Sequence, residues 1–314
     1  MKRFLGFLIV FMFAFTLQAT NYALVIGIGN YPDVDHGWPT IHGNNDISIV
    51  CEMLSVNGFE KENITTLCDS QATYDAILSA FKDLESKLSK ADVVYIHFSG
   101  HGQRISDKNG DEFDKFDEAW VPYDALQEAT EYYNGEKHLI DDQINKLLKG
   151  LRKKIGKKGK IVAVTDACHS GTATRHCIAP KNPDIVRGTE IGFYLDSAKE
   201  DYEEYDYYRL ETKIMWYIRL FGQEAFLKRT TEHPTEWISI AACADNEQNR
   251  QIKLADGSQY GSLSYALYSL RNELWHLTIK ELRTKLKEEV GRFVLRRQNP
   301  QINFDGDENQ YLFR

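Results

Sequence analysis

Residues 91–102, ADVVYIHFSGHG, combine a strand signal with a candidate chemical group. The run Ala91–Phe98 is short, apolar and rich in β-branched and aromatic residues, which is typical of a strand buried on both faces. It ends in a loop where two glycines flank His101. The stretch therefore predicts a buried strand that carries a histidine just beyond its carboxyl end.

Similar apolar runs alternate with helical patterns along the chain. We expect further strands at Tyr22–Ile28, Asn63–Cys68, Lys160–Thr165 and Trp237–Ala242, and a terminal strand or hairpin at Gln301–Phe304 and Gln310–Phe313. Apolar residues at helical spacing predict helices at Asn45–Leu54, Thr73–Leu88, Asp141–Leu151, Ser262–Leu274 and Thr278–Val290. One of Asn44, Asn45 and Asp46 should cap the first of these helices. Repeated strand–helix units predict an α/β fold with a parallel sheet and helices on both faces.

The amino terminus has the pattern of a secretory signal peptide over residues 1–20. A basic start at Met1–Arg3 precedes the apolar run Phe4–Leu17, and small residues follow. The run is shorter than the roughly 20 residues that a membrane-spanning helix needs. We therefore expect an exported protein that is periplasmic, at the cell surface or extracellular, with an uncleaved anchor as the alternative.

Charge and cysteine content narrow the classes of function. The formal net charge of −8 argues against nucleic acid as a partner, because binding phosphates requires a basic surface. The five cysteines have no CxxC spacing, which argues against a zinc site or a redox pair, and an odd number leaves at least one thiol unpaired.

Two motifs follow neighbouring strands of the predicted sheet, and parallel sheets place their chemistry beyond the carboxyl ends of the strands. His101 follows one strand, and Cys168 follows Lys160–Thr165. A thiol titrates near ~8.5, so a sulfur nucleophile needs a nearby base and donors for the oxyanion. We predict Cys168 as nucleophile, His101 as its acid–base partner, and the N–H groups of Gly102 and Cys168 as oxyanion donors. Either motif alone would be weak evidence, since a buried cysteine is usually a small hydrophobe.

These motifs resemble those of a known family. Tyr22–Gly29, Ser99–Gly102 and Asp166–Gly171 are similar to the first strand, histidine loop and cysteine loop of metacaspases and their bacterial relatives. The DACHSG sequence differs from the QAC(R/Q/G)G signature of animal caspases. The resemblance covers residues 22–174 and extends more weakly over 236–314. It implies a caspase-like three-layer α/β/α sandwich with a mostly parallel six-stranded sheet, and a cysteine endopeptidase of family C14.

The resemblance also implies a division of the chain. Residues 21–174 correspond to the large caspase subunit, 175–235 to an insert, and 236–314 to the small subunit that completes the same domain. We expect self-processing within 172–235, where Arg175, Lys181, Arg187 and Lys199 offer basic sites.

Metacaspases cleave after Arg or Lys, and their pocket acids correspond to Asp46 and Asp166 here, with Ser99 alongside. Buried carboxylates suit a guanidinium because the hydrogen bonds are charge-assisted. The structural alternatives are a helix cap for Asp46 and support of the turn for Asp166.

Many metacaspases are activated by Ca²⁺, and the family's calcium carboxylates correspond to Asp117, Asp141 and Asp142. Hard cations prefer several oxygen ligands. A further family acid corresponds to Arg175, which cannot bind calcium, and a solvated acidic loop is the alternative interpretation of this region.

We therefore expect a monomeric, exported cysteine endopeptidase that acts on peptides or proteins with basic residues. Two alternatives remain: a non-proteolytic caspase-fold binding module at the cell surface, and a related peptidase with another preference, such as Asn or Asp, at P1, the residue whose carbonyl is attacked.

Overall fold

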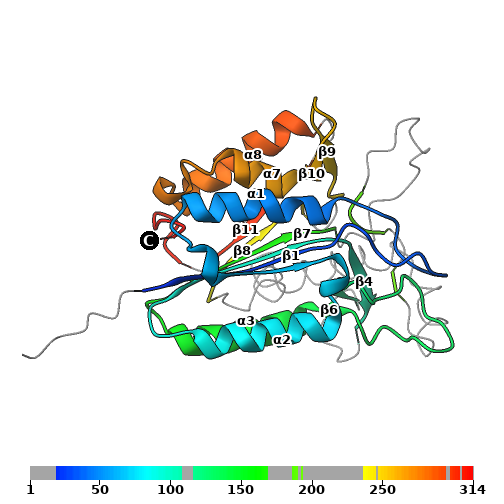
Figure 1. The fold of residues 1–314 in the computed structure, drawn as a ribbon. Helices are drawn as coiled ribbons and strands as arrows, with labels where there is room; N and C mark the ends of the chain where they lie inside the picture. The colour runs from blue at the N-terminus through cyan, green and yellow to red at the C-terminus, as the bar shows by residue number, and fades with distance from the viewer. Residues whose placement is uncertain are drawn as a thin grey trace, which may run out of the picture.

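A six-stranded sheet forms the centre of the molecule (Figure 1). The computed structural model describes residues 19–107, 116–168, 186–189, 192–193, 236–244, 247–294, 298–304 and 306–313. The strands lie in the order β11-β8-β7-β3-β1-β2. Their bounds are β1 Asn21–Gly27, β2 Ile64–Cys68, β3 Val93–Ser99, β7 Lys160–Asp166, β8 Ile238–Ala241 and β11 Gln301–Asn303. All neighbouring pairs are parallel except β11 with β8, so the predicted mostly parallel sheet is confirmed.

Helices cover both faces of this sheet and complete the predicted three-layer sandwich. Figure 1 shows α1 (Gly43–Val56), α7 (Ser262–Ser269) and α8 (Ile279–Phe293) on one face, and α2 (Tyr74–Lys87) and α3 (Asp141–Ile155) on the other.

The buried strands explain why their sequences are continuously apolar. In β1, Leu24 and Ile26 belong to the core on one face, and Ala23 and Val25 belong to the core on the other. All four side chains are fully buried, because successive side chains of a strand point to opposite faces and both faces carry helices.

Two smaller sheets were not predicted. Strands β4 (Gly102–Ser106), β5 (Phe116–Trp120) and β6 (Leu139–Ile140) form one antiparallel sheet, and β9 (Gln251–Lys253) and β10 (Gln259–Gly261) form a hairpin. These strands are too short to show a clear period-2 pattern. Short 3-10 turns occur at Lys61–Asn63, Asp69–Gln71 and Leu274–His276.

Some predicted element ends are wrong. The helix expected at Ser262–Leu274 ends at Ser269 and continues as turns, and Gln310–Phe313 is not a strand but contributes one bridge, from Tyr311 to Thr278. Leu312 and Phe313 are buried in the core beneath α1, α7 and α8. Their apolar side chains therefore reflect packing and not strand pairing.

The prediction of a side-chain cap on α1 is also wrong. The helix begins earlier than expected, with His42 at the N-cap and no capping hydrogen bond from its side chain. The three polar side chains instead bond to other elements: Asn44 to Asp69, Asn45 to the Gln259 carbonyl, and Asp46 to Ser99.

Of the helices in the described part of the chain, none combines the length and apolar composition that crossing a membrane requires. The predicted signal peptide lies almost entirely outside the described residues.

Candidate active site

The sheet register brings the two predicted catalytic residues to the same edge. β3 and β7 pair in parallel with Ser99 opposite Asp166, the last residue of each strand. His101 and Cys168 each follow two residues later, and both are buried. The parallel strands therefore place the histidine and cysteine loops side by side, as a site at the carboxyl edge requires.

The ring of His101 is fixed by aromatic neighbours and one hydrogen bond. It stacks on Trp38 with ring centroids 4.8 Å apart, and the Tyr31 ring lies 5.1 Å away. Its Nε2 is 2.8 Å from the carbonyl oxygen of Pro39. Because a carbonyl oxygen can only accept, Nε2 carries the proton and donates it.

The other ring nitrogen is then the basic one. Nδ1 of His101 is buried and makes no hydrogen bond to any residue that the structure describes. Burial lowers the pKa of His101 to about 4, so the ring is neutral at ordinary pH. A neutral imidazole with an unprotonated Nδ1 can accept the proton of a thiol.

Tyr31 holds the histidine loop in place. Its hydroxyl accepts a hydrogen bond from the His101 backbone N–H at 3.0 Å and donates one to the Val121 carbonyl, also at 3.0 Å. Gly100 is needed here, because a Cβ at that position would lie 3.0 Å from the Tyr31 hydroxyl and 2.9 Å from the Phe98 ring. Tyr31 and Trp38 were not among the predicted site residues, because their only signal in the sequence is an aromatic pair after β1.

Residues 186–189, within the predicted insert, lie across these loops. The Arg187 carbonyl oxygen accepts hydrogen bonds from the N–H groups of Cys168 at 2.7 Å and Gly102 at 3.4 Å. These are the two donors predicted for an oxyanion. The Arg187 N–H donates to the Asn249 carbonyl at 3.1 Å, and Val186 forms an antiparallel bridge with Arg250.

Gly188 follows directly and threads between the two loops. A Cβ on Gly188 would lie 2.9 Å from Cys168 Cβ, 2.5 Å from the Cys168 carbonyl oxygen and 2.9 Å from the Gly102 carbonyl oxygen. The peptide bond between Arg187 and Gly188 therefore lies beside both the histidine loop and the cysteine loop.

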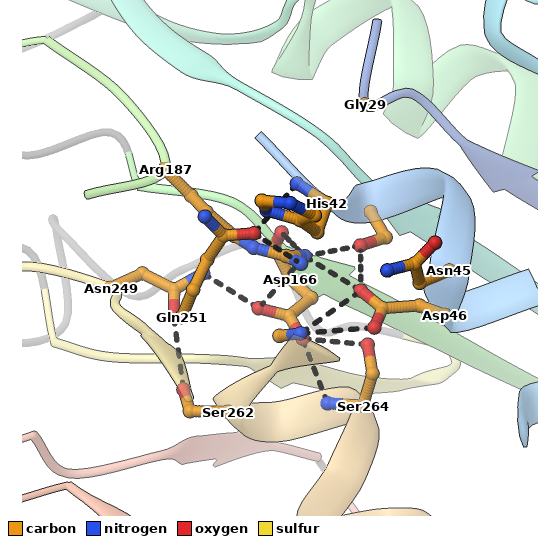
Figure 2. Close-up of polar contacts among 12 residues, drawn as sticks. Gly29, His42, Asn45, Asp46, Asp166, Arg187, Asn249, Gln251, Ser262 and Ser264 are labelled. Carbon is orange, nitrogen blue, oxygen red and sulfur yellow. Dashed lines mark hydrogen bonds and ion pairs between the residues drawn. The ribbon is translucent and has the colours of Figure 1, made fainter. Parts of the chain in front are cut away.

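The Arg187 side chain fills a pocket formed by the residues predicted to bind a basic side chain. Figure 2 shows its guanidinium between the carboxylates of Asp46 and Asp166. Nη1 lies 2.8 Å from Asp46 Oδ2 and 3.7 Å from Asp166 Oδ1, and it also donates to the Ser99 hydroxyl. Nη2 lies 3.5 Å from Gln251 Oε1. The three side chains in the ion pairs are fully buried.

Backbone and side-chain donors hold the first carboxylate. Asp46 accepts from the Gly261 N–H at 2.9 Å and from the Ser99 hydroxyl at 2.5 Å. Burial raises the pKa of Asp46, and Arg187 and these donors oppose that rise. Burial lowers the pKa of Arg187, but the two carboxylates outweigh it and the pKa is raised overall. The guanidinium is therefore fully charged in the pocket.

Asp166 is held by residues that sequence reasoning did not find. It accepts from Asn249 Nδ2 at 2.7 Å and from the N–H and hydroxyl of Ser264 at 2.7 and 2.6 Å (Figure 2). The Ser264 hydroxyl lies 3.0 Å from His97 Nε2, and the Tyr95 hydroxyl lies 3.3 Å from His97 Nδ1. This buried network fixes the position of the Asp166 carboxylate.

Gly261 forms one wall of the pocket. A Cβ on this residue would lie 2.1 Å from Asp166 Oδ2 and 2.5 Å from Arg187 Nη1. Only glycine leaves room for the guanidinium and its carboxylate together.

A second thiol adjoins Cys168. The sulfurs of Cys168 and Cys243 lie 3.6 and 3.3 Å from the same carbonyl oxygen, that of Glu247. A hydrogen bond with the Cys168 side chain, together with burial, raises the pKa of Cys243. No disulfide joins the cysteines that the structure describes, and Cys177 lies outside the described residues.

The predicted calcium residues come from adjoining elements. Asp117 lies in β5, and Asp141 and Asp142 begin α3 directly after β6, which pairs with β5. Within the described ranges, no group of three or more His, Cys, Asp or Glu side chains is arranged to hold a metal ion. Residues 108–115 and Arg175 lie outside those ranges, so calcium binding stays a prediction.

Comparison with known proteins gives a consistent result. A family model described as "Metacaspase, peptidase C14 domain" matches residues 21–176. Metacaspase-1 of Candida albicans is 25% identical over 255 residues, 73% of this chain and 53% of the relative. Metacaspase III c of Phaeodactylum tricornutum is 38% identical over 164 residues, 49% of this chain and 43% of the relative. The chain thus spans about half the length of these relatives.

The solved structure of a Geobacter sulfurreducens protein shares the fold. It has a TM-score of 0.62 and 20% identity, and the match covers 94% of this chain and 97% of the other. At this identity the likeness shows the fold alone.

Proposed function

We propose that this chain, whose residues 21–176 match the metacaspase, peptidase C14 family model, is a cysteine endopeptidase that cleaves after Arg or Lys. Its first substrate is its own bond between Arg187 and Gly188. One observation carries the proposal: the Arg187 carbonyl oxygen accepts from the Cys168 and Gly102 N–H groups while its guanidinium lies between two buried carboxylates.

The geometry supports a thiol mechanism. His101 Nδ1 takes the proton of Cys168, and the sulfur attacks the Arg187 carbonyl carbon. The oxygen becomes negatively charged, and the Gly102 and Cys168 N–H groups stabilise it. The bond to Gly188 then breaks as His101 returns its proton to the leaving amine. A water molecule, deprotonated by His101, hydrolyses the Arg187 thioester and regenerates the thiol.

The charge balance supports a basic P1 residue. Asp46 and Asp166 are both fully buried, and Arg187 supplies the cation between them. Buried charges are tolerated only when paired, so a neutral side chain would leave the carboxylates uncompensated. A Lys side chain could supply the charge but could not bridge Asp46 and Gln251 as a planar guanidinium does.

Self-processing is tested by incubating the purified full chain and identifying new termini by intact mass and amino-terminal sequencing. We expect a fragment that begins at Gly188 in the unaltered protein and in Arg187→Lys, and none in Arg187→Gln or Cys168→Ala. The same fragment from Cys168→Ala would refute the assigned nucleophile, and processing that continues at Gly188 in Arg187→Gln would refute the pocket.

Specificity in trans is tested with a substrate library that varies only P1. The proposal requires cleavage after Arg and Lys and none after Asn, Asp or Gln. A preference for Asn or Asp would instead favour the alternative peptidase. A Cys168 that does not react with a peptidyl electrophile carrying Arg at P1 would favour a non-proteolytic binding module.

Calcium activation, export and a monomeric state remain proposals that rest on the sequence. Titrating activity with calcium, in the unaltered protein and in Asp117→Asn, tests the first. An activity that does not change up to millimolar calcium would refute calcium activation. Fractionation of cells that express the full chain and sizing of the purified protein test the other two.

A further inference from the structure

The insert contacts the body of the protein at a second place, beyond Gly188. Phe193 lies along β4: its N–H donates to the Arg104 carbonyl at 2.7 Å, and its carbonyl accepts from the Ser106 N–H at 3.0 Å. Phe193 and Ile105 form a parallel bridge. Among the strands that the structure describes, β4 pairs with β5 alone, so its other edge receives this segment.

The Phe193 side chain occupies an aromatic pocket and is 1% exposed. Its ring lies edge-on to Tyr133 with centroids 5.7 Å apart, and its centroid is 4.9 Å from that of His138. Gly135 forms the base, with φ at +79°. A Cβ there would lie 2.6 Å from Ile105 Cδ1 and 3.0 Å from the Phe193 ring.

The walls of this pocket are held by bonds that do not involve Phe193. The Tyr133 hydroxyl and His138 Nδ1 lie 2.8 Å apart, and His138 Nε2 is 2.7 Å from Gln103 Oε1. Gln103 in turn donates to the Gln127 carbonyl at 2.9 Å. The pocket is therefore a built feature that would persist after Phe193 leaves it.

We propose that the open edge of β4 and this aromatic pocket form a prime-side substrate-binding site. It takes a peptide that runs parallel to β4 and carries an aromatic residue six positions after the basic P1 residue, as Phe193 follows Arg187. Main-chain bonds to a strand edge supply affinity, and a side-chain pocket supplies selectivity. This inference rests on the proposed function.

The chain's own segment around Phe193 occupies this site first, and a protein substrate occupies it afterwards. While Phe193 stays bound, Gly188 remains beside Cys168, so another peptide cannot place its own residue after P1 there. When the processed segment leaves, the edge and the pocket become available together.

The test compares two peptides that reproduce residues 183–196, one with Phe and one with Ala at the position of Phe193. The enzyme is the processed Phe193→Ala variant, whose own segment no longer fills the pocket. Burial of a phenylalanine ring predicts kcat/KM about tenfold or more higher for the Phe peptide, expressed mainly in KM. A short reporter substrate that ends at P1 is measured in every variant, so that folding and chemistry are monitored separately.

Pocket variants connect the preference to the structure. Adding Tyr133→Ala should abolish the preference for the Phe peptide, whereas Tyr132→Ala, which alters a neighbouring side chain that is 86% exposed, should retain it. Equal kcat/KM for the two peptides, or a preference that survives Tyr133→Ala, would overturn the proposal.

A binding assay tests the proposed site independently of catalysis. In Cys168→Ala/Phe193→Ala, fluorescence anisotropy should show the labelled Phe peptide binding about tenfold more tightly than the Ala peptide. If this difference is found without any hydrolysis by the Phe193→Ala enzyme, the binding site stands and the proposed peptidase function fails. If the enzyme hydrolyses after Arg but does not distinguish the two peptides, the peptidase function stands and the proposed binding site fails.

Discussion

Replacing Arg187 with Met in a Cys168→Ala background tests the buried ion pairs in the uncleaved chain. The substitution removes the cation and leaves the carboxylates of Asp46 and Asp166, both fully buried, without it. Breaking a buried pair by removing one partner typically costs about 3–5 kcal/mol. Asp46 retains its bonds to Gly261 and Ser99, so we expect the lower end, about 3 kcal/mol of unfolding free energy.

The loss should depend on pH in a defined direction. Burial raises the pKa of Asp46, and Arg187 opposes that rise, so removing Arg187 raises the pKa further. A carboxyl group whose pKa is higher in the folded state than in the unfolded state binds a proton more readily when folded. The deficit is therefore smallest at acidic pH and grows as the pH rises from the pKa of Asp46 in the presence of Arg187 to its higher pKa in the variant.

Urea unfolding at pH 5 and pH 8 measures both effects. Arg283→Met is the matched control, because Arg283 pairs with Glu308 where both side chains are about half exposed, and such pairs contribute about 0–1 kcal/mol. Adding Asp46→Asn to Arg187→Met should recover part of the loss. A cost for Arg187→Met no greater than that for Arg283→Met at both pH values would contradict a stabilising role for the buried ion pairs.

Three further predictions concern the pocket and the buried histidines. Asp46→Asn should lower kcat/KM for Arg substrates by about 100-fold, since truncating one partner of a buried charge pair costs about 2–5 kcal/mol; an unchanged value would place the specificity elsewhere. Gly261→Ala should block the pocket and abolish processing, judged by fragment mass, whereas Gly291→Ala, with no heavy atom within 4 Å of the added Cβ, should not. Burial lowers the pKa of both His97 and His101 from 6.5 to about 4, so unfolding free energy should fall by about 3 kcal/mol per histidine as the pH drops from about 6.5 to 4. Urea unfolding across that range should show a shallower fall in His97→Gln, and an equal slope would contradict the assignment.

The central sheet could be predicted from the sequence because its signal is local. The runs that became β1, β3 and β7 are apolar on both faces and end in glycine or polar residues, so both the strands and the loops after them were evident. The order of the strands then brought His101 and Cys168 to one edge. The acids Asp46 and Asp166 came from the family resemblance, because neither has a distinctive local pattern.

The occupant of the pocket could not be predicted in the same way. Arg187 is one of several basic residues in the predicted insert, and nothing in the neighbouring sequence distinguishes it. Its place depends on contacts with residues far along the chain, including Asp46, Ser99 and Asn249. Short strands such as β4 and β9 were not predicted because five and three residues are too few to show a periodic pattern.

The hydrogen bonds between Phe193 and β4 affect whether the proposed self-cleavage is completed. In the proposed self-cleavage, attack by Cys168 forms a thioester at Arg187 and frees the amine of Gly188. As long as Phe193 holds its segment against β4, that amine stays beside the thioester, where it competes with water and can restore the peptide bond. Binding of Phe193 to β4 thus favours resealing of the bond. Release of the aromatic ring from its pocket then becomes the step that makes maturation irreversible.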